Sequence, residues 1–238
     1  MDNKIKNYRL PQIDFVRGIA VLLMVLFNWS FTLSFLKVYT IDGGWLYWWL
    51  FPRLIGGSFI FLAGLSVVLS HKKSGSKKIV FRGLKIFLVG MGITALTWIF
   101  YPGYTVWFGI LHLIGLSVIL SVVFLKYKKL ILLIGTILLI LGIALQSTGF
   151  NFSFLVWLGL SPFDFQTFDY WPLLPWFGVF LLGMYFSDLF LKGIKNKKYS
   201  KKPIINQVCF LGRNSLVIYI IHQPVLVALL YLSGIKIF

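Results

Sequence analysis

The chain has 238 residues, of which 59% are hydrophobic and 12% are charged. A water-soluble globule of this length cannot bury so much apolar surface, so the composition excludes a soluble domain and predicts an integral membrane protein. The 23 basic and six acidic residues give a formal net charge of +17. How that charge is distributed along the chain decides what it indicates.

Seven apolar stretches follow one another, each long enough to cross a hydrocarbon core of about 30 Å. We expect spans near residues 18–38, 45–70, 79–100, 106–125, 130–147, 172–191 and 206–233. The aromatic stretch 150–165 is shorter and is typical of an interfacial or re-entrant segment. The sequence therefore predicts an all-α, polytopic transmembrane helix bundle of about seven spans, forming one integral-membrane domain over residues 1–238.

Basic residues gather in alternate connections between these spans. They cluster within residues 4–17, 72–85, 126–129 and 192–202, whereas the intervening connections contain aspartates and almost no Lys or Arg. By the positive-inside rule, the N-terminus is cytoplasmic and the C-terminus is external. The charge thus indicates topology and contact with the lipid bilayer, not nucleic-acid binding. We predict a multi-pass protein of the cell membrane.

The first apolar stretch and the single cysteine each have an alternative interpretation. The stretch is long and is followed by no small-residue cleavage site, so we expect a retained helix and not a signal peptide. Cys209 is the only cysteine, which excludes an internal disulfide and a cysteine metal cluster. We predict a buried structural thiol and no metal site.

Polar side chains interrupt the first two spans. Arg17 and Asn28 are three helical turns apart, so they share one helix face with a separation of roughly 16 Å along the axis. Arg53 lies near the start of the second span. An unpaired arginine at the bilayer centre costs about 2.5–3.5 kcal/mol. It must therefore meet an anion, a dipole or water, or snorkel to the outer interface, and both alternatives stay open.

Two histidines lie in later spans. His112 is in the fourth, and His222 follows Ser215 and Tyr219 on one stripe of the last. Each histidine alone is compatible with a neutral imidazole bonded to a carbonyl across a helix interface. Taken together with Asn28 and Arg53 at a similar depth, they favour a shared polar cavity.

Five segments in chain order carry a family resemblance. They read "IDFVRGIAVLLMVLFNWSF", "FIFLAGLS", "WFGILHLIG", "DYWPLLPWFGVFLLG" and "LGRNSLVIYIIHQPVL". The chain resembles a short prokaryotic-type member of the heparan-alpha-glucosaminide N-acetyltransferase catalytic-domain family, a group of transmembrane acyltransferases. The resemblance implies transfer of an acyl group from cytoplasmic acetyl-CoA, or another acyl-CoA, to an amine or hydroxyl of a sugar or other acceptor at the external side.

This sequence departs from that family at two positions of the first span. Many short prokaryotic members have a histidine where Asn28 stands and an aspartate where Thr32 stands. The eukaryotic enzyme that names the family has asparagine at the first position and a histidine a few turns later, which this chain lacks. These departures leave the identity of the catalytic base open.

Acyl transfer requires a base, donors for the developing oxyanion and cations for the phosphates of CoA. We expect His222 to be the base, with His112 as the second candidate, and Asn28 and Arg53 to orient the acyl carbonyl. The residues expected to bind CoA phosphates, at predicted cytoplasmic helix ends, are Arg17, Lys85 and Arg213. Arg17 is also expected to pair with Asp14, three residues earlier.

Several alternatives stay open at this point. Asp164 and Asp169, among many aromatic residues, are compatible with an acceptor-sugar site and with an interfacial belt that contains a helix cap. The same polar cavity would serve a transporter or flippase of a small polar or lipid-linked solute. A catalytically silent membrane binding subunit is the third interpretation. The sequence identifies neither the acceptor nor the acyl chain. Whether the chain forms a homo-oligomer also stays open.

Overall fold

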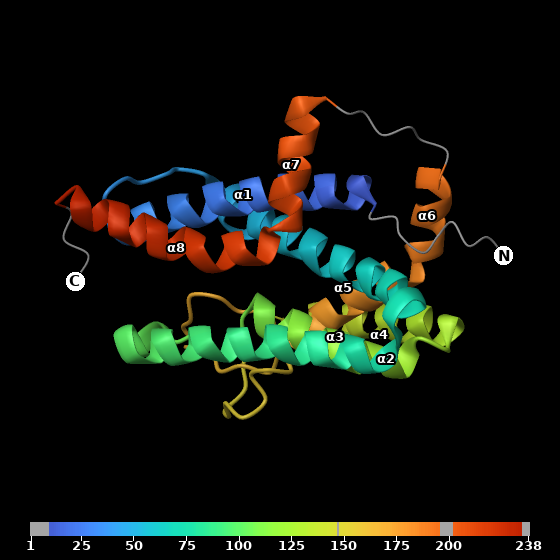
Figure 1. Cartoon of the computed structure of the whole chain (residues 1–238). Coiled ribbons are helices and arrows are strands. Elements are labelled where there is room, and N and C mark those ends of the chain that lie inside the picture. Colours follow the sequence, from blue (N-terminus) through green and yellow to red (C-terminus); the bar gives the residue numbers. More distant parts are fainter. Residues whose placement is uncertain (1–9, 147, 196–201, 235–238) are drawn as a thin grey trace. The chain divides into compact units, whose positions relative to one another are not determined.

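The computed structural model describes residues 10–146, 148–195 and 202–234, and this part of the chain is helical. Its only β-type pairing is an isolated bridge between Phe108 and Tyr170. The all-α prediction is confirmed. Figure 1 shows the elements, which are α1 (Pro11–Phe35), η2 (Leu46–Leu50), α2 (Phe51–Phe100), η3 (Pro102–Tyr104), α3 (Ile110–Phe124), α4 (Lys128–Leu145), α5 (Leu173–Tyr185), α6 (Ser187–Lys195), α7 (Pro203–Arg213) and α8 (Ser215–Leu232).

Among the described residues, five helical segments are long and apolar enough to cross a membrane. They are Pro11–Phe35, Leu46–His71, Lys73–Phe100, Lys128–Leu145 and Ser215–Leu232. A pair of helices bent by 46°, Leu173–Tyr185 and Ser187–Gly193, makes a sixth if it is one broken span. The apolar helix α3 has 15 residues, fewer than a full crossing needs. The count of about seven spans and the orientation of the termini therefore stay predictions.

The last predicted span, 206–233, is divided in the structure. Helix α7 ends at Arg213, and α8 begins at Ser215. Between them, Asn214 leaves the helical conformation and its side-chain amide donates to the carbonyl of Phe210, 2.9 Å away. Asparagine side chains compete in this way with helix continuation, so one predicted span became two helices. The stretch 150–165 contains no helix, as expected of a segment that does not cross.

Helix α2 is interrupted at Gly75. This glycine has a φ of +72°, which a residue with a side chain rarely adopts. The chain folds back there, so that the two limbs of α2 form a hairpin (Figure 1). Arg82 on the second limb donates to the Ser70 hydroxyl on the first, at 3.3 Å. This turn lies in one of the basic connections, between lysines on both sides.

The chain divides into two compact units, Met1–Phe59 with Asn196–Phe238, and Ile60–Lys195. In the first unit, α1 packs against α7 and α8. The crossing of α1 and α7 is close because Gly18 lies on the Val208 carbonyl and Gly212 on the Asp14 carbonyl, where no Cβ would fit. Its core is a cluster of Met24, Phe27 and Ile55 with surrounding aromatic rings. The prediction of a single domain stays a prediction.

The second unit contains most of α2 together with α3, α4, α5 and α6. Its fully buried residues include Ile60, Leu65, Leu113, Phe180 and Leu181. The connections 101–109 and 146–172 are joined by backbone hydrogen bonds from Phe168 to Tyr104 and from Trp171 to Phe108. These two connections therefore lie together at one end of the unit.

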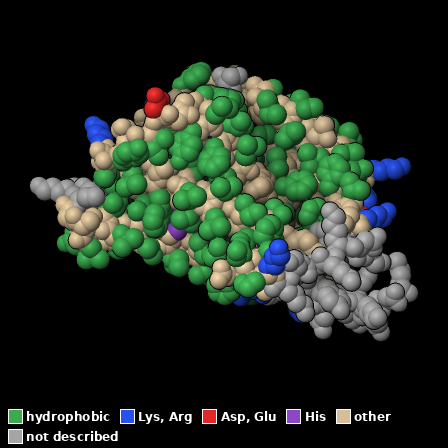
Figure 2. Space-filling view, turned by 90° about the horizontal axis from the view of Figure 1, so that it is seen from above, with side chains coloured by type: hydrophobic (Ala, Val, Ile, Leu, Met, Phe, Trp, Pro, Cys, Tyr) green, Lys and Arg blue, Asp and Glu red, His purple; other side chains and the backbone are tan. Residues whose placement is uncertain are grey.

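Large apolar side chains remain exposed along the helices. Leu26, Phe81, Ile140 and Val123 are each more than half exposed, and Figure 2 shows apolar side chains over much of one face, with few Lys and Arg in view. A soluble protein rarely exposes so much contiguous apolar surface. Contact with lipid explains these exposed apolar side chains. Helices can make that contact because their backbone hydrogen bonds are formed within the segment.

Candidate active site

The central feature of the first unit is a hydrogen-bonded pair, Asn28 on α1 and His222 on α8. The Asn28 Nδ2 atom lies 3.0 Å from Nε2 of His222. The imidazole is 6% exposed. These residues are 194 positions apart in sequence, so the fold has brought together two of the four residues that were predicted to share a cavity.

The protonation of the His222 ring follows from its partners. Its Nδ1 atom lies 2.7 Å from the carbonyl oxygen of Tyr219 and 3.2 Å from that of Ile218. Carbonyl oxygens only accept, so Nδ1 carries the proton. In the neutral ring, Nε2 then has the free electron pair and accepts from the Asn28 amide. The basic nitrogen therefore faces α1.

Neighbouring residues hold the two helices in this register. The Trp29 indole donates to the backbone carbonyl of His222 at 3.3 Å. One turn further along α1, the Gln223 amide donates to the Thr32 hydroxyl at 3.1 Å. Thr32 also donates back to the Asn28 carbonyl at 2.9 Å. Sequence reasoning did not assign Trp29 or Gln223 to the site, although each directly follows a member of the pair.

Two of the three residues expected to bind CoA phosphates lie at the α1–α7 crossing. Arg17 is within 3.9 Å of Asp14, as predicted, and Gly212, next to Arg213, lies on the Asp14 carbonyl. Arg213 is exposed. Arg17 and Arg213 thus belong to the same corner of the first unit, at the N-terminal end of α1. Cys209 is buried at this crossing and its thiol donates to the Pro11 carbonyl at 3.3 Å, so the predicted burial of this thiol is confirmed.

The third residue, Lys85, belongs to the second unit. Its Nζ atom lies over the ring of Phe81, 4.7 Å from the centroid. Its assignment to the CoA phosphates stays a prediction.

The Arg53 side chain is directed toward Trp49 in η2, the segment that directly precedes α2. Its guanidinium donates to the carbonyl of Trp49 at 2.9 Å and lies 4.2 Å from the centroid of the Trp49 ring. Trp49 stacks on Trp45, and both rings are more than a third exposed. Paired exposed tryptophans are typical of a membrane interface. This geometry favours the snorkelling alternative for Arg53.

His112 uses both of its ring nitrogens within the second unit. Its Nδ1 accepts the backbone N–H of Gly109 at 3.2 Å. The Thr94 hydroxyl donates its proton to the Val106 carbonyl at 2.6 Å, so the Thr94 oxygen accepts from Nε2 of His112 at 3.2 Å. The ring is 1% exposed and lies against Phe87 and Phe108. Because His112 and His222 belong to different units, their shared cavity stays a prediction.

Asp169 lies at the same helix start as His112. Its Oδ2 atom accepts the backbone N–H of Ile110, the first residue of α3, at 3.0 Å. Of the two interpretations left open by the sequence, this contact supports the helix cap. Within the described residues, no group of three or more His, Cys, Asp or Glu lies close enough to hold a metal ion.

The family model for heparan-alpha-glucosaminide N-acetyltransferase, catalytic, matches residues 9–224. The chain belongs to this family. Neither a search of curated proteins nor a search of solved structures gave a significant match. The family-model match over residues 9–224 confirms the resemblance inferred from five sequence segments.

Membership in the heparan-alpha-glucosaminide N-acetyltransferase family indicates a membrane acetyltransferase. The apolar helices agree with a multi-pass membrane protein, and acyl-CoA is the general cosubstrate of such transfer. All predicted site residues lie inside the matched range, namely Arg17, Asn28, Arg53, Lys85, His112, Arg213 and His222.

Proposed function

We propose that this chain transfers an acyl group, in the first instance acetyl, from cytoplasmic acyl-CoA to an amine or hydroxyl of an acceptor at the external side of the cell membrane. The observation that carries the proposal is the Asn28–His222 pair, in which backbone carbonyls hold Nδ1 protonated and turn the basic Nε2 toward a side-chain amide. Family membership supplies the reaction type, and the pair supplies groups that fit it.

The proposed reaction is a direct transfer. Nε2 of His222 accepts the proton of the acceptor while the acceptor nitrogen or oxygen bonds to the thioester carbon. The carbon–sulfur bond breaks, and the proton passes from His222 to the sulfur of the departing CoA. A positioned general base of this kind contributes about 10²- to 10⁴-fold to turnover.

Asn28 has two tasks in this mechanism. Its amide N–H, released from Nε2 when the acceptor enters, donates to the oxygen of the thioester carbonyl as that oxygen becomes negative. Rotation of the amide by half a turn would instead present Oδ1 to the protonated ring. A carboxamide serves both states because it carries a donor and an acceptor on the same group.

The basic corner at the α1–α7 crossing supports a cytoplasmic donor. Arg17 and Arg213 lie near the predicted cytoplasmic end of α1, and their cations suit the phosphates of CoA. Asn28 is 11 residues further along the same helix, roughly 16 Å along its axis. We propose that the CoA head group binds at this corner and that its thioester arm extends toward His222.

The contacts of His112 and Arg53 support roles other than those expected from the sequence. Both ring nitrogens of His112 are engaged in holding the start of α3, so we assign it to folding of the second unit. Arg53 is engaged with Trp49, so we assign it to anchoring the start of α2 at the interface. His222 is then the single base.

One observation favours a catalytically silent binding subunit as the second candidate. Asn28 donates to the same nitrogen that would have to accept a proton, and the pair also serves as a helix-packing contact. A transporter has no comparable support from a specific contact. The experiment must therefore separate transfer from simple binding.

The test uses the full chain, purified into lipid nanodiscs, with labelled acetyl-CoA and a panel of amino sugars and simple glycosides. We expect release of free CoA together with a labelled product. His222→Ala should reduce the rate by about 10²- to 10⁴-fold with little change in CoA affinity. His71→Ala is the matched control, because His71 is a histidine of the second unit outside the proposed site.

Equal rates in the His222 variant and the unchanged chain would overturn the assignment of the base. CoA binding without transfer to any acceptor would support the silent subunit. Uptake of solute into sealed vesicles without consumption of acyl-CoA would support a transporter.

A further inference from the structure

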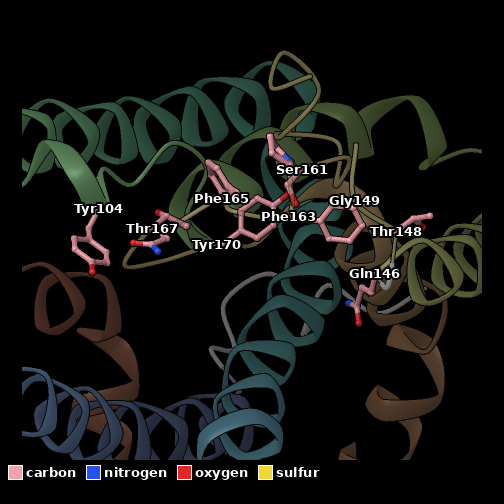
Figure 3. A pocket seen from close by; sticks show the side chains of 11 residues that line it. Tyr104, Gln146, Thr148, Gly149, Ser161, Phe163, Phe165, Thr167 and Tyr170 are labelled. Atoms are coloured by element: carbon pink, nitrogen blue, oxygen red, sulfur yellow. The ribbon is translucent and has the colours of Figure 1, made fainter. Parts of the chain in front are cut away.

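The second unit contains a cavity that none of the predicted catalytic residues lines. Its volume is about 460 Å³, within the roughly 300–1,000 Å³ that is usual for small-molecule sites. The connection between α4 and α5 forms most of it, and Tyr104 contributes from the connection between α2 and α3 (Figure 3). The cavity is thus built at the end of the unit where these two connections are hydrogen-bonded to each other.

The lining combines aromatic side chains with polar groups that are uncharged. Gln146 and Gln166 contribute amides, and Ser161 and Thr167 contribute hydroxyls. None of the lining residues that the structure describes carries a charge at neutral pH. Burial raises the pKa of Tyr170 above its ordinary value, so its phenol stays neutral as well. Amides and hydroxyls in this number suit a ligand with many hydroxyl groups.

An exposed aromatic ring completes the cavity. Phe163 is 84% exposed, although one side of its ring lies directly against the backbone of Gly149. Figure 3 shows the Phe163 ring next to Gly149 and the rings of Phe165 and Tyr170 further along the same lining. The centroids of the Phe165 and Tyr170 rings are 5.1 Å apart. A sugar ring has an apolar C–H face and a rim of hydroxyls. It therefore matches an open aromatic face surrounded by amides and hydroxyls.

Backbone hydrogen bonds hold this surface in place before any ligand arrives. The N–H of Phe150 donates to the Ser161 carbonyl at 3.2 Å, which closes the loop across its width. The N–H of Phe168 donates to the Tyr104 carbonyl at 3.2 Å and joins the two connections. A preformed surface loses less conformational entropy on binding than a mobile one does.

The charges of the two connections select among sugars. Residues 101–109 and 146–172 contain Asp164 and Asp169 and no Lys or Arg. Heparan is a sulfated polyanion, and a chain of this kind finds no Lys or Arg for its sulfates in either connection and meets the negative charge of two aspartates. The uncharged lining, in connections that contain acidic but no basic residues, therefore fits an uncharged glycan better than the anionic polysaccharide in the family's name.

We propose that this cavity binds an uncharged sugar ring of the acceptor, and that the acceptor is a neutral glycan. The second half of this statement rests on the proposed acyl transfer. Binding of the sugar itself does not, because the cavity lies wholly within residues 60–195.

The experiment measures binding of cellobiose, lactose and diacetylchitobiose to the full chain in nanodiscs, without acyl-CoA, by saturation-transfer NMR and calorimetry. A sulfated heparan disaccharide is the anionic comparison. We expect at least one neutral disaccharide to bind, and Phe163→Ala and Gln166→Ala to weaken it tenfold or more. Phe154→Ala and Asn151→Ala are matched controls, because both residues are exposed on the same connection outside the cavity.

Absence of binding by all three neutral disaccharides would overturn the proposal. Equal weakening by control and cavity variants, or tighter binding of the sulfated disaccharide, would overturn it too. His222→Ala should retain sugar binding while it loses transfer, so the two proposals fail separately. A chain that binds the neutral sugar and transfers no acyl group would keep the binding site and exclude the acceptor role.

Discussion

Both ring nitrogens of His222 have hydrogen-bond partners, but one nitrogen meets backbone carbonyls and the other meets a side chain. Two backbone carbonyls of its own helix hold Nδ1, and no substitution at Tyr219 or Ile218 removes them. A single side chain, Asn28, meets Nε2. The tautomer is therefore built into α8, whereas the state of the basic nitrogen depends on one replaceable residue. That difference makes Asn28 the sharper position for mutation.

Asn28→Asp tests the role of the amide at nearly constant shape. A carboxylate only accepts, so it bonds to Nε2 when that atom carries a proton, and a protonated imidazole is no base. The carboxylate also donates nothing to an oxyanion. We expect turnover to fall by about 10²-fold or more with CoA affinity within a few-fold of normal, measured by steady-state kinetics and CoA binding.

A stability measurement on the Asn28 variants separates a loss of catalysis from a loss of folding. Hydrogen bonds between helices in membranes contribute on average about 0.6 kcal/mol, and roughly 1.7 kcal/mol at most. Asn28→Ala should therefore still fold, and its thermal unfolding in detergent should shift by a few degrees at most. If Asn28→Asp and Asn28→Ala both fold and keep normal turnover, Asn28 is only a packing residue.

The members of the pair were predictable from the sequence, but their partnership was not. Asn28 and His222 each interrupt an apolar helix, and a polar side chain in hydrocarbon requires a partner. The sequence does not say which partner. Arg53 and His112 met the same criterion, but their partners lie elsewhere. Arg53 bonds to Trp49, and His112 bonds to Gly109 and Thr94.

At the scale of helices, the α1–α7 crossing depends on two glycines. A Cβ on Gly212 would collide with the Asp14 carbonyl, and backbone cannot move aside as a flexible side chain can. Overpacking of this kind costs about 1–3 kcal/mol. We expect Gly212→Ala to lower the thermal unfolding temperature and to weaken CoA binding, since Arg17 and Arg213 lie at this crossing. Gly92→Ala, with open space around it, should leave both unchanged.

The start of α3 gives a second prediction at this scale. His112→Ala leaves the Gly109 N–H and the Thr94 oxygen without their ring partner, and an unsatisfied buried polar group costs about 1–3 kcal/mol. We expect a clear loss of stability, measured by tryptophan fluorescence on heating, while turnover per folded molecule stays within a few-fold. Asp169→Ala, which removes a cap, should cost about 0.5–2 kcal/mol. A hundredfold loss of turnover in stable His112→Ala would make His112 catalytic.

Helix positions followed well from hydropathy where the segment was uniformly apolar. The predicted stretches near 45–70 and 130–147 correspond to Leu46–His71 and Lys128–Leu145. Hydropathy was less informative at breaks, because a single residue decides them. Asn214 divided the last predicted span, and the bend between α5 and α6 divided another.

For the whole molecule, orientation is the prediction that assigns every proposed role to a side of the membrane. The basic segments indicate which side is cytoplasmic, and residues 4–9 and 196–201 of them lie outside the described residues. The turn at Gly75, the connection 101–109 and residues 148–172 of the connection between α4 and α5 are described. A test of orientation by cysteine labelling can therefore use these connections.

We expect single cysteines at these places to be labelled from opposite sides. In a Cys209→Ser background, which keeps a donor for the Pro11 carbonyl, the substitution Ser76→Cys reports the turn between the two limbs of α2. Gly103→Cys and Ser153→Cys report the two opposite connections, and both positions are exposed. Because the turn is flanked by lysines and the other two connections contain none, the positive-inside rule places the turn in the cytoplasm.

A membrane-impermeant maleimide should label Gly103→Cys and Ser153→Cys in intact cells and Ser76→Cys only after permeabilisation. The opposite pattern would put the sugar cavity on the cytoplasmic side, where the CoA donor is found, and would contradict transfer across the membrane.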